Sequence, residues 1–240
     1  MVEHKVLKDL NIKIFADGAN LDSIKKLNEL DFISGFTTNP SLMKKAGVVD
    51  YKKFANELVS IVPSKPISFE VFADDLLQME EQALEIASWG ENINVKIPIM
   101  NTKGELTDKV IKNLSKKKIK LNITAIFTID QIKKILAIVK DSETILSVFA
   151  GRIYDCGIDA KQKVLEMNKL IHENTKCKSL WASTRMPYDY MTAIEVGTDI
   201  ITMQISHVKK MEMFGFDLTE YSKKTVKQFY QDARTSGFDI

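Results

Sequence analysis

The sequence is poor in the residues on which several common kinds of site depend. Its 240 residues include only two cysteines, Cys156 and Cys177, and three histidines, His4, His172 and His207. Two cysteines without metal-type spacing exclude a disulfide framework and fit a reducing compartment. Three scattered histidines poorly supply a metal cluster or a histidine-based triad, so we expect no metal site.

An excess of one charge and long apolar segments are also lacking. Lysine and arginine number 34 and aspartate and glutamate 32, which leaves a formal net charge of +2. We therefore expect neither nucleic acid nor a membrane as a partner. No apolar segment approaches the roughly 20 residues that cross a bilayer, and the segment from Met1 to Lys5 has no signal-peptide core. These features predict a soluble, cytoplasmic protein.

What the sequence does contain is eight short apolar runs rich in β-branched residues. Most of them are apolar on both faces, which is typical of parallel strands that are covered on both sides. The runs lie at 13–17, 35–38, 67–72, 93–97, 120–127, 145–150, 179–183 and 200–204.

Segments of helical period separate these runs. Apolar residues from 51 to 62 recur on one helix face, and Asp50 stands where an N-cap belongs. Thr128 and Gln131 have the spacing of a capping box, and Gly197 and Gly215 are placed as helix stops. The alternation, without a linker, predicts one domain over residues 1–240, a single (β/α)8 TIM barrel with a C-terminal helical tail at 216–240. A doubly wound open sheet is the alternative, but the count of eight strands favours the barrel.

The most informative run is Ile-Asn-Val-Lys-Ile-Pro-Ile-Met at 93–100, which has Lys96 in its middle. A charged ammonium in a buried strand is costly unless it has a use. Burial lowers the pKa of a lysine, and the neutral amine is a nucleophile that forms a Schiff base with a carbonyl. The alternative is a structural lysine whose stem packs in the strand while its ammonium reaches water.

Polar residues stand inside or just beyond seven of the predicted strands. The C-terminal ends of barrel strands meet at one mouth, so we expect these residues to share a site there. Each of them alone is more often a turn residue, a cap or a structural hydrogen-bond partner. They are Asp17, Thr38, Asn39, Glu70, Lys96, Asn122, Thr124, Ser147, Arg152, Ser183 and Arg185.

Motifs along nearly the whole chain resemble the transaldolase family, including its small members and the fructose-6-phosphate aldolases. The Thr-Thr-Asn-Pro-Ser and Val-Lys-Ile-Pro motifs, at their present separation, are the specific signal, and the others alone are weak. The motifs are Phe15-Ala-Asp-Gly-Ala-Asn20, Thr37-Thr-Asn-Pro-Ser41, Val95-Lys-Ile-Pro98, Asn122-Ile-Thr124, Ser147-Val-Phe-Ala-Gly-Arg152 and Ala182-Ser-Thr-Arg185.

The resemblance implies a role for four catalytic residues. Lys96 is the Schiff-base lysine, and Asp17 is the general acid/base that handles the hydroxyl proton during carbon–carbon cleavage. Asp17 is also the expected charge partner of the buried lysine, and its alternative role is that of a turn residue before Gly18. Glu70 and Thr124 match positions that hold a catalytic water.

The remaining matches concern the substrate. Arg152, Ser183 and Arg185 match the phosphate site of the family, and a guanidinium suits that role because its forked donors meet two oxygens at once. Asn39 and Asn122 match positions that hold substrate hydroxyls. The resemblance also assigns substrate-binding positions to Thr38, Ser147 and Phe149.

Two positions distinguish transfer from cleavage. The aldolases that release free dihydroxyacetone carry Gln at the position of Glu70 and Tyr at that of Phe149, whereas this chain has the transaldolase-type pair. Without a phenol, the three-carbon enamine waits for an aldehyde acceptor. The resemblance therefore implies a transaldolase of carbohydrate metabolism in the pentose phosphate pathway, with sugar phosphates as substrates and without a cofactor.

Two departures from the family pattern keep other functions open. Gly18 stands where the family usually has Thr or Ser, and residues 72–75 are bulkier than expected, so we expect a reshaped donor side of the pocket. One alternative is an aldolase that releases dihydroxyacetone, or an enzyme specialised for a modified sugar. An alternative of another class is a non-catalytic phosphosugar-binding barrel in which Lys96 is only a charge partner.

The helical tail at 216–240 has two interpretations. In small members of the family a C-terminal helix packs on a neighbouring subunit, so the resemblance implies a homo-oligomer, a pentamer or a decamer. The simpler alternative is a helix that closes the same barrel.

Overall fold

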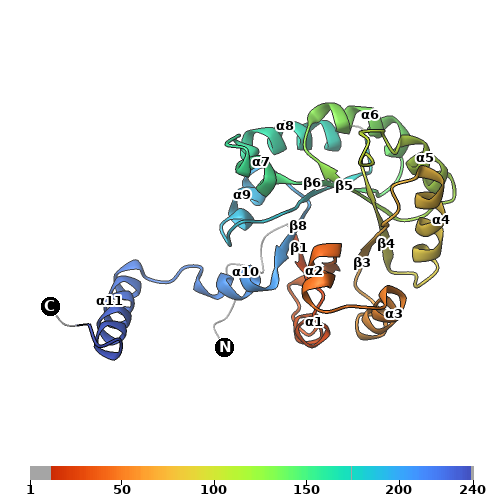
Figure 1. Cartoon of the computed structure of the whole chain (residues 1–240). Coiled ribbons are helices and arrows are strands. Elements are labelled where there is room, and N and C mark those ends of the chain that lie inside the picture. Colours follow the sequence, from red (N-terminus) through yellow and green to blue (C-terminus); the bar gives the residue numbers. More distant parts are fainter. Residues whose placement is uncertain (1–11, 174, 239–240) are drawn as a thin grey trace.

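Each of the eight apolar runs forms one strand of a closed parallel barrel (Figure 1). The computed structural model describes residues 12–173 and 175–238, so the N-terminal segment with Met1 and His4 lies outside the described part, as do residues 174, 239 and 240. The strands are β1 (Lys13–Asp17), β2 (Ile33–Thr37), β3 (Ile67–Glu70), β4 (Ile93–Pro98), β5 (Leu121–Ile126), β6 (Ile145–Val148), β7 (Lys178–Trp181) and β8 (Ile200–Gln204). They follow one another in chain order, and β8 pairs with β1 to close the barrel.

This architecture confirms the predicted (β/α)8 barrel and excludes the open doubly wound sheet. The predicted runs 13–17 and 200–204 coincide with β1 and β8, and the other runs differ from their strands by at most two residues at an end. Several of the differences arise where the chain stays apolar after it leaves the sheet. Phe149 and Ala150 extend the sixth run, for example, but Ala150 already begins a helix.

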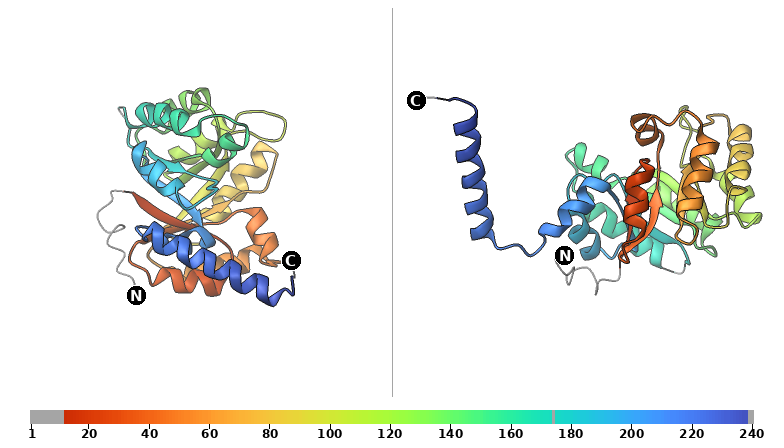
Figure 2. Two further views of the ribbon diagram at one scale, coloured as in Figure 1. Left: turned by 90° about the vertical axis from the view of Figure 1, so that its left-hand side faces the viewer. Right: turned by 90° about the horizontal axis from the view of Figure 1, so that it is seen from below.

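Helices cover the outside of the barrel, and the views in Figure 1 and Figure 2 show them wrapped around the strands. A single α-helix follows β1, β3, β4, β5 and β7, and two follow each of β2, β6 and β8. The helices are α1 (Leu21–Asn28), α2 (Pro40–Lys45), α3 (Tyr51–Ile61), α4 (Leu76–Ala87), α5 (Asp108–Lys116), α6 (Ile129–Val139), α7 (Ala150–Asp155), α8 (Ala160–His172), α9 (Asp189–Glu195), α10 (Ile205–Lys210) and α11 (Leu218–Thr235), with the 3-10 turn η1 (Met211–Met213) before α11.

The predicted helix boundaries rest on local hydrogen bonds. The side chain of Asp50 accepts a hydrogen bond from the backbone of Lys53 at 2.9 Å and caps α3. Thr128 and Gln131 form both bonds of the capping box at the start of α6. Gly197 and Gly215 follow α9 and η1 with φ values of +70° and +78°, a conformation in which glycine carries no steric penalty.

Side chains along each strand point alternately to the outside and to the inside of the barrel, and this divides the core into two parts. Ile14 and Ala16 of β1 pack outward among the helices, whereas Phe15 between them points into the barrel. Inside, Phe15 joins an apolar cluster that comes mainly from β6, β7 and β8, and on β3 to β5 the interior carries buried polar side chains. The apolar cluster is Phe15, Ile145, Leu180, Ala182 and Ile200, and the buried polar residues on β3 to β5 include Ser68, Asn94, Lys96 and Asn122.

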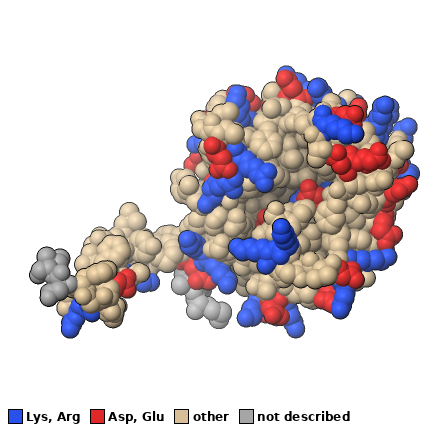
Figure 3. All heavy atoms as spheres, viewed as in Figure 1, with Lys and Arg blue, Asp and Glu red and all other residues tan. Residues whose placement is uncertain are grey.

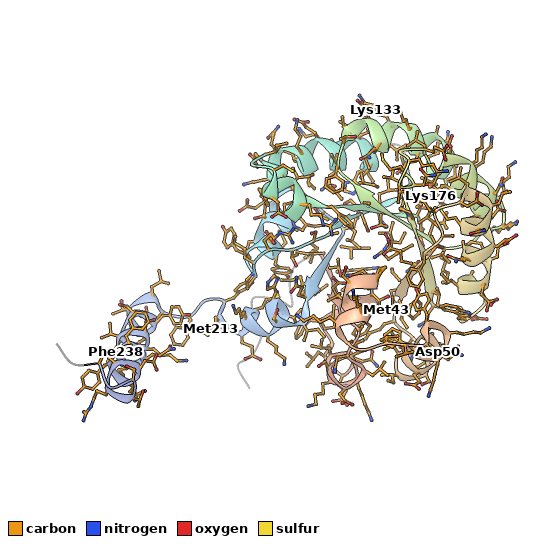
Figure 4. All side chains as sticks on the ribbon, viewed as in Figure 1. Met43, Asp50, Lys133, Lys176, Met213 and Phe238 are labelled. Atoms are coloured by element: carbon orange, nitrogen blue, oxygen red, sulfur yellow. The ribbon has the colours of Figure 1, made fainter. Side chains whose placement is uncertain are left out.

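The C-terminal helix α11 stands apart from the barrel in Figure 1 and in the right-hand view of Figure 2. In Figure 4, Met213 is labelled on the segment that joins the barrel to α11, and Phe238 is labelled beside α11. None of the side chains of α11 is buried, and Leu218, Val226 and Phe229 are 81%, 63% and 66% exposed. The simpler expectation, a helix that closes its own barrel, is therefore wrong. No helix among the described residues is long and apolar enough to cross a membrane.

A glycine on β2 makes room for the apolar half of the interior. A Cβ atom at Gly35 would lie 2.6 Å from Cε1 of Phe15, closer than side chains approach one another. Phe15 is 2% exposed and belongs to the interior cluster, so its ring has no free space into which it can move.

We expect Gly35→Ala to lower the free energy of unfolding by about 1–3 kcal/mol through overpacking against Phe15. The measurement is urea unfolding followed by circular dichroism. The control is Gly90→Ala, whose Cβ would meet only side chains, at 3.2 Å or more, and at a position with ordinary φ. Wild-type stability of Gly35→Ala would contradict this account of the interior.

Candidate active site

The C-terminal ends of the strands surround a cavity of about 430 Å³. Figure 3 shows a hollow in this face of the molecule, with acidic atoms in its depth and basic side chains around it. Eleven of the twelve residues predicted for the site line the cavity, and Thr38 does not. The eleven are Asp17, Asn39, Glu70, Lys96, Asn122, Thr124, Ser147, Phe149, Arg152, Ser183 and Arg185.

Lys96 lies in the depth of this cavity, 7% exposed, on β4. Its ammonium Nζ is 3.1 Å from Oε2 of Glu70 and donates a hydrogen bond to the carbonyl oxygen of Thr38 at 2.9 Å. Glu70 and Lys96 are also register partners on the adjacent strands β3 and β4. The expectation that Asp17 pairs with the lysine is therefore corrected: Glu70, on the next strand, forms the ion pair.

Asp17 ends β1 on the other side of the cavity. Its Oδ1 accepts a hydrogen bond from the hydroxyl of Thr37 at 2.7 Å, and its Oδ2 has a longer contact of 3.4 Å with Nδ2 of Asn39. Burial raises the pKa of Asp17, and the positive charge of Lys96 and the bond from Thr37 oppose that rise. A carboxylate in this setting accepts a proton more readily than an exposed aspartate does.

A chain of buried side chains orients the amide of Asn122. The hydroxyl of Ser147 donates to Oδ1 of Asn122 at 2.6 Å, and Nδ2 of Asn122 donates to the hydroxyl of Ser68 at 3.1 Å. These bonds determine which end of the amide is the donor and leave one N–H of Asn122 for a ligand. Ser147 thus contacts Asn122 as well as lining the cavity.

Thr124 lies two residues beyond Asn122 on β5. Its hydroxyl is buried and has no hydrogen-bond partner among the described residues, although a buried hydroxyl normally has one. The next residue, Ala125, has a φ of +58°, and the pairing of β5 with β6 is irregular between Ile123 and Ile126. Strain of this kind is common where a strand turns side chains toward a site.

Two arginines follow β6 and β7: Arg152 lies on the short helix α7, and Arg185 lies on the loop after β7. The guanidinium of Arg152 stacks over the ring of Phe149, 5.3 Å from its centre. Arg185 forms a bidentate ion pair with Asp155, in which Nε donates to Oδ1 at 2.9 Å and Nη2 donates to Oδ2. The hydrogen bond from Arg185 holds the pKa of Asp155 below its usual value.

The start of α7 and the loop after β7 touch at their backbones. A Cβ atom at Gly151 would lie 1.6 Å from the carbonyl oxygen of Ser183, so only glycine allows this approach. Ser183 itself has a φ of +63°. The buried carboxylate of Asp189 accepts hydrogen bonds from the backbone N–H groups of Arg185 and Met186, at 2.6 and 3.1 Å. Backbone contacts thus place both arginines beside the cavity.

Several cavity residues are missing from the sequence-based prediction. Thr37 lines the cavity where Thr38 was expected, because Thr37 shares the inward face of β2 with Gly35. Thr202 and Gln204 of β8 line it too. A period of two along the predicted strands is the signal that would have found them, since alternate residues point to the same side.

The two departures from the family pattern lie outside the cavity lining. A Cβ atom at Gly18 would lie 2.8 Å from Cδ1 of Ile205, so glycine accommodates the start of α10. The ring of Phe72 packs on Tyr51 with 4.5 Å between centres, and Asp75 caps α4. The expected reshaping of the pocket by 72–75 is not seen among the residues that line it.

The two histidines of the described part each contact a polar side chain nearby. His172 contacts the carboxylate of Asp199 at 2.8 Å, and His207 contacts the hydroxyl of Thr184 at 3.3 Å. No three His, Cys, Asp or Glu side chains among the described residues are grouped closely enough to hold a metal ion.

Residues 14–240 match the family described as transaldolase/fructose-6-phosphate aldolase. A probable transaldolase of a Thermoanaerobacter species is 35% identical over 230 residues, which cover 95% of this chain and 100% of that protein. A probable transaldolase of Dehalococcoides mccartyi is 32% identical over 210 residues, covering 87% and 93%. The chain belongs to the transaldolase/fructose-6-phosphate aldolase family. The recognition from motifs is confirmed, and the protein is an enzyme of the transaldolase and aldolase class.

Solved structures with low sequence identity share the architecture. A crystal structure of dihydrodipicolinate synthase from Rhodopseudomonas palustris has a TM-score of 0.53 and 15% identity, covering 92% of this chain and 79% of that one. At this identity the likeness supports the barrel fold alone.

The ion pair of Lys96 and Glu70 predicts how substitutions at these two positions change the free energy of unfolding. Removal of one partner leaves the other charge buried and unpaired, so we expect Glu70→Ala to lower the free energy of unfolding by about 3 kcal/mol. The double variant Lys96→Met/Glu70→Gln removes both charges, and we expect it to recover most of that loss. Guanidinium unfolding at pH 7 measures all three proteins. Equal losses in the single and double variants would show that the pairing does not matter.

Proposed function

We propose that the protein is a transaldolase that transfers a dihydroxyacetone unit from a ketose phosphate to an aldose phosphate through a Schiff base on Lys96. The observation that carries the proposal is one cavity in which the buried Lys96 has a carboxylate at 3.1 Å and a second carboxylate, that of Asp17, faces it. Family membership and the names of the relatives support the same activity.

Imine formation begins with the ion pair. The ammonium of Lys96 is not nucleophilic, and Glu70 is placed to take its proton. The free amine attacks the ketose carbonyl, and loss of water gives the protonated imine. Glu70 and the unpartnered hydroxyl of Thr124 together offer an acceptor and a donor for the water that this step releases.

Carbon–carbon cleavage then uses Asp17. The carboxylate takes the proton from the hydroxyl group next to the bond that breaks, the aldehyde leaves, and the bonding electrons move to the imine nitrogen. The products are an aldehyde and an enamine on Lys96. The raised pKa of Asp17 suits a group that must accept this proton and later return it to the new hydroxyl.

Transfer requires that the enamine survive until an acceptor aldehyde binds. Phe149 lines the cavity with an apolar ring, which supplies no proton to the enamine carbon. Arg152 and Arg185 offer forked donors at the rim for the phosphate of the donor and of the acceptor. This composition favours transfer over release of free dihydroxyacetone, and we place the activity in sugar phosphate metabolism of the cytoplasm, within the pentose phosphate pathway.

We propose further that the protein is a homo-oligomer, a pentamer or a decamer, in which α11 packs on a neighbouring copy. The side chains of Leu218, Tyr221, Val226 and Phe229 recur at helical spacing along α11, and all are exposed in the single chain. An amphipathic helix without a partner leaves apolar area in water that a second copy would cover.

The covalent mechanism predicts a three-carbon adduct on Lys96. Borohydride reduction in the presence of fructose 6-phosphate traps the imine, and intact mass with peptide mapping locates it. We expect the adduct in wild type and its complete loss in Lys96→Ala, while Lys120→Ala, which removes an exposed lysine at the edge of β5, retains it.

The alternatives give other results in the same experiment. Free dihydroxyacetone without an added aldehyde would favour an aldolase. Bound sugar without any adduct, with fructose 6-phosphate and with sedoheptulose 7-phosphate, would favour a binding barrel. Full turnover by a folded Lys96→Ala would overturn the assignment.

Two aspartates introduced on the apolar face of α11 test whether this helix packs on a neighbouring copy. We expect Val226→Asp/Phe229→Asp to lower the molar mass measured by sedimentation equilibrium to that of smaller species, because the carboxylates cannot be buried in the contact. The matched control, Lys227→Asp/Gln231→Asp, places two carboxylates on the opposite face and keeps the wild-type mass. A wild-type protein that sediments as a monomer at micromolar concentration would contradict the proposal.

A further inference from the structure

Two threonines link Asp17 to the interior of the barrel. The hydroxyl of Thr37, at the end of β2, bonds Oδ1 of Asp17 at 2.7 Å, and the same hydroxyl lies 2.5 Å from the hydroxyl of Thr202 on β8. Thr37 and Thr202 are 3% and 6% exposed. The strands β2 and β8 are the two neighbours of β1, so the threonines approach Asp17 from both sides.

The chemistry of the groups fixes the direction of these hydrogen bonds. An ionised carboxylate can only accept, so Thr37 donates its single hydroxyl proton to Asp17. Thr37 then has only lone pairs to offer to its other neighbour, and Thr202 must be the donor in the second bond. The order of donation is Thr202 to Thr37 to Asp17.

We propose that Thr37 and Thr202 form a hydroxyl relay that positions Asp17 and favours its ionised form, so that both threonines are positioning residues of the reaction. This inference rests on the proposed function for its kinetic consequence. In the relay, both threonines act on the reaction through the carboxylate of Asp17 and not by direct contact with the reacting atoms.

The relay opposes the effect of burial on Asp17. Burial raises the pKa of this carboxyl, whereas the bond from Thr37 lowers it. The charged groups that act on Asp17 are Lys96 from β4 and Glu70 from β3, of opposite sign, and the neighbours from β2, α2 and β8 are the neutral Thr37, Asn39 and Thr202. A hydroxyl that itself accepts a hydrogen bond is a stronger donor, so Thr202 adds to the effect of Thr37.

The relay also gives the two carboxylate oxygens of Asp17 different hydrogen bonds. Oδ1 is occupied by the short bond from Thr37, and Oδ2 has only the 3.4 Å contact with Asn39. Oδ2 is therefore the oxygen that takes the substrate proton. In that step one O–H bond of the substrate breaks and one forms at Oδ2, and the relay bond to Oδ1 is retained because a protonated carboxyl still accepts at its other oxygen.

The test removes each hydroxyl without changing the shape of the side chain. As a base, Asp17 acts only when ionised, so kcat/KM rises with pH through the pKa of Asp17 in the free enzyme, and a higher pKa moves this acidic limb of the pH profile to higher pH. We expect a shift of roughly 0.5–1 pH unit upward for Thr37→Val. For Thr202→Val we expect the acidic limb of the pH profile to move in the same direction by about 0.2 pH unit. Thr37→Ser and Thr202→Ser keep the hydroxyl and the wild-type limb.

A direct titration makes the result independent of turnover. The ¹³C NMR shift of the Asp17 carboxyl, assigned with Asp17→Asn, reports the same pKa without substrate. Thr198→Val is the matched control, because it removes a buried hydroxyl that binds Asn168 away from the cavity, and it leaves both the limb and the titration unchanged.

Three outcomes would overturn the relay: an unchanged carboxyl titration in folded Thr37→Val, a downward shift in Thr202→Val, or a failure of Thr37→Ser to restore the wild-type value. Absence of any sugar turnover in wild type would instead count against the proposed function, and the NMR titration would still decide the relay.

Discussion

The charge of Lys96 is the constraint on which the rest of the site depends. An ammonium inside a barrel loses its hydration and requires an opposite charge and hydrogen-bond acceptors at short range. Glu70 and the carbonyl oxygen of Thr38 supply them. The same burial raises the pKa of Asp17 across the cavity. Burial thus produces a paired amine on one side of the cavity and a proton acceptor on the other, which is what lysine-based carbon–carbon chemistry needs.

The register of the strands decides which side chains of the site are neighbours in the closed barrel. Glu70 pairs with Lys96, Lys96 with Asn122, and Asp17 with Thr37. The functional contacts are therefore largely contacts between neighbours in the sheet, and they are as rigid as the backbone hydrogen bonds that set the register. The apolar cluster around Phe15 occupies the other part of the interior.

The rim is built differently from the interior. Arg152 lies on the short helix α7 and Arg185 on the loop after β7, and backbone contacts, such as the approach of Gly151 to the carbonyl of Ser183, bring the two segments together. The partner of Arg185, Asp155, is exposed, so this ion pair is screened by water. Under the proposed function, a buried ion pair in the depth and exposed arginines at the rim suit an enzyme that must admit a donor and then an acceptor.

The sequence alone determined the strand count, the strand boundaries to within two residues, several helix ends and the family, and eleven of the twelve residues that it assigned to the site line the cavity. These follow from local patterns, because apolar period, caps and motifs are properties of short segments. Only the tertiary structure decided that Glu70 and not Asp17 pairs with Lys96, that Thr202 reaches Thr37, and that α11 stands away from its own barrel. These contacts join strands far apart in the chain, and their partners depend on register, side-chain direction and closure of the sheet, which no single segment encodes.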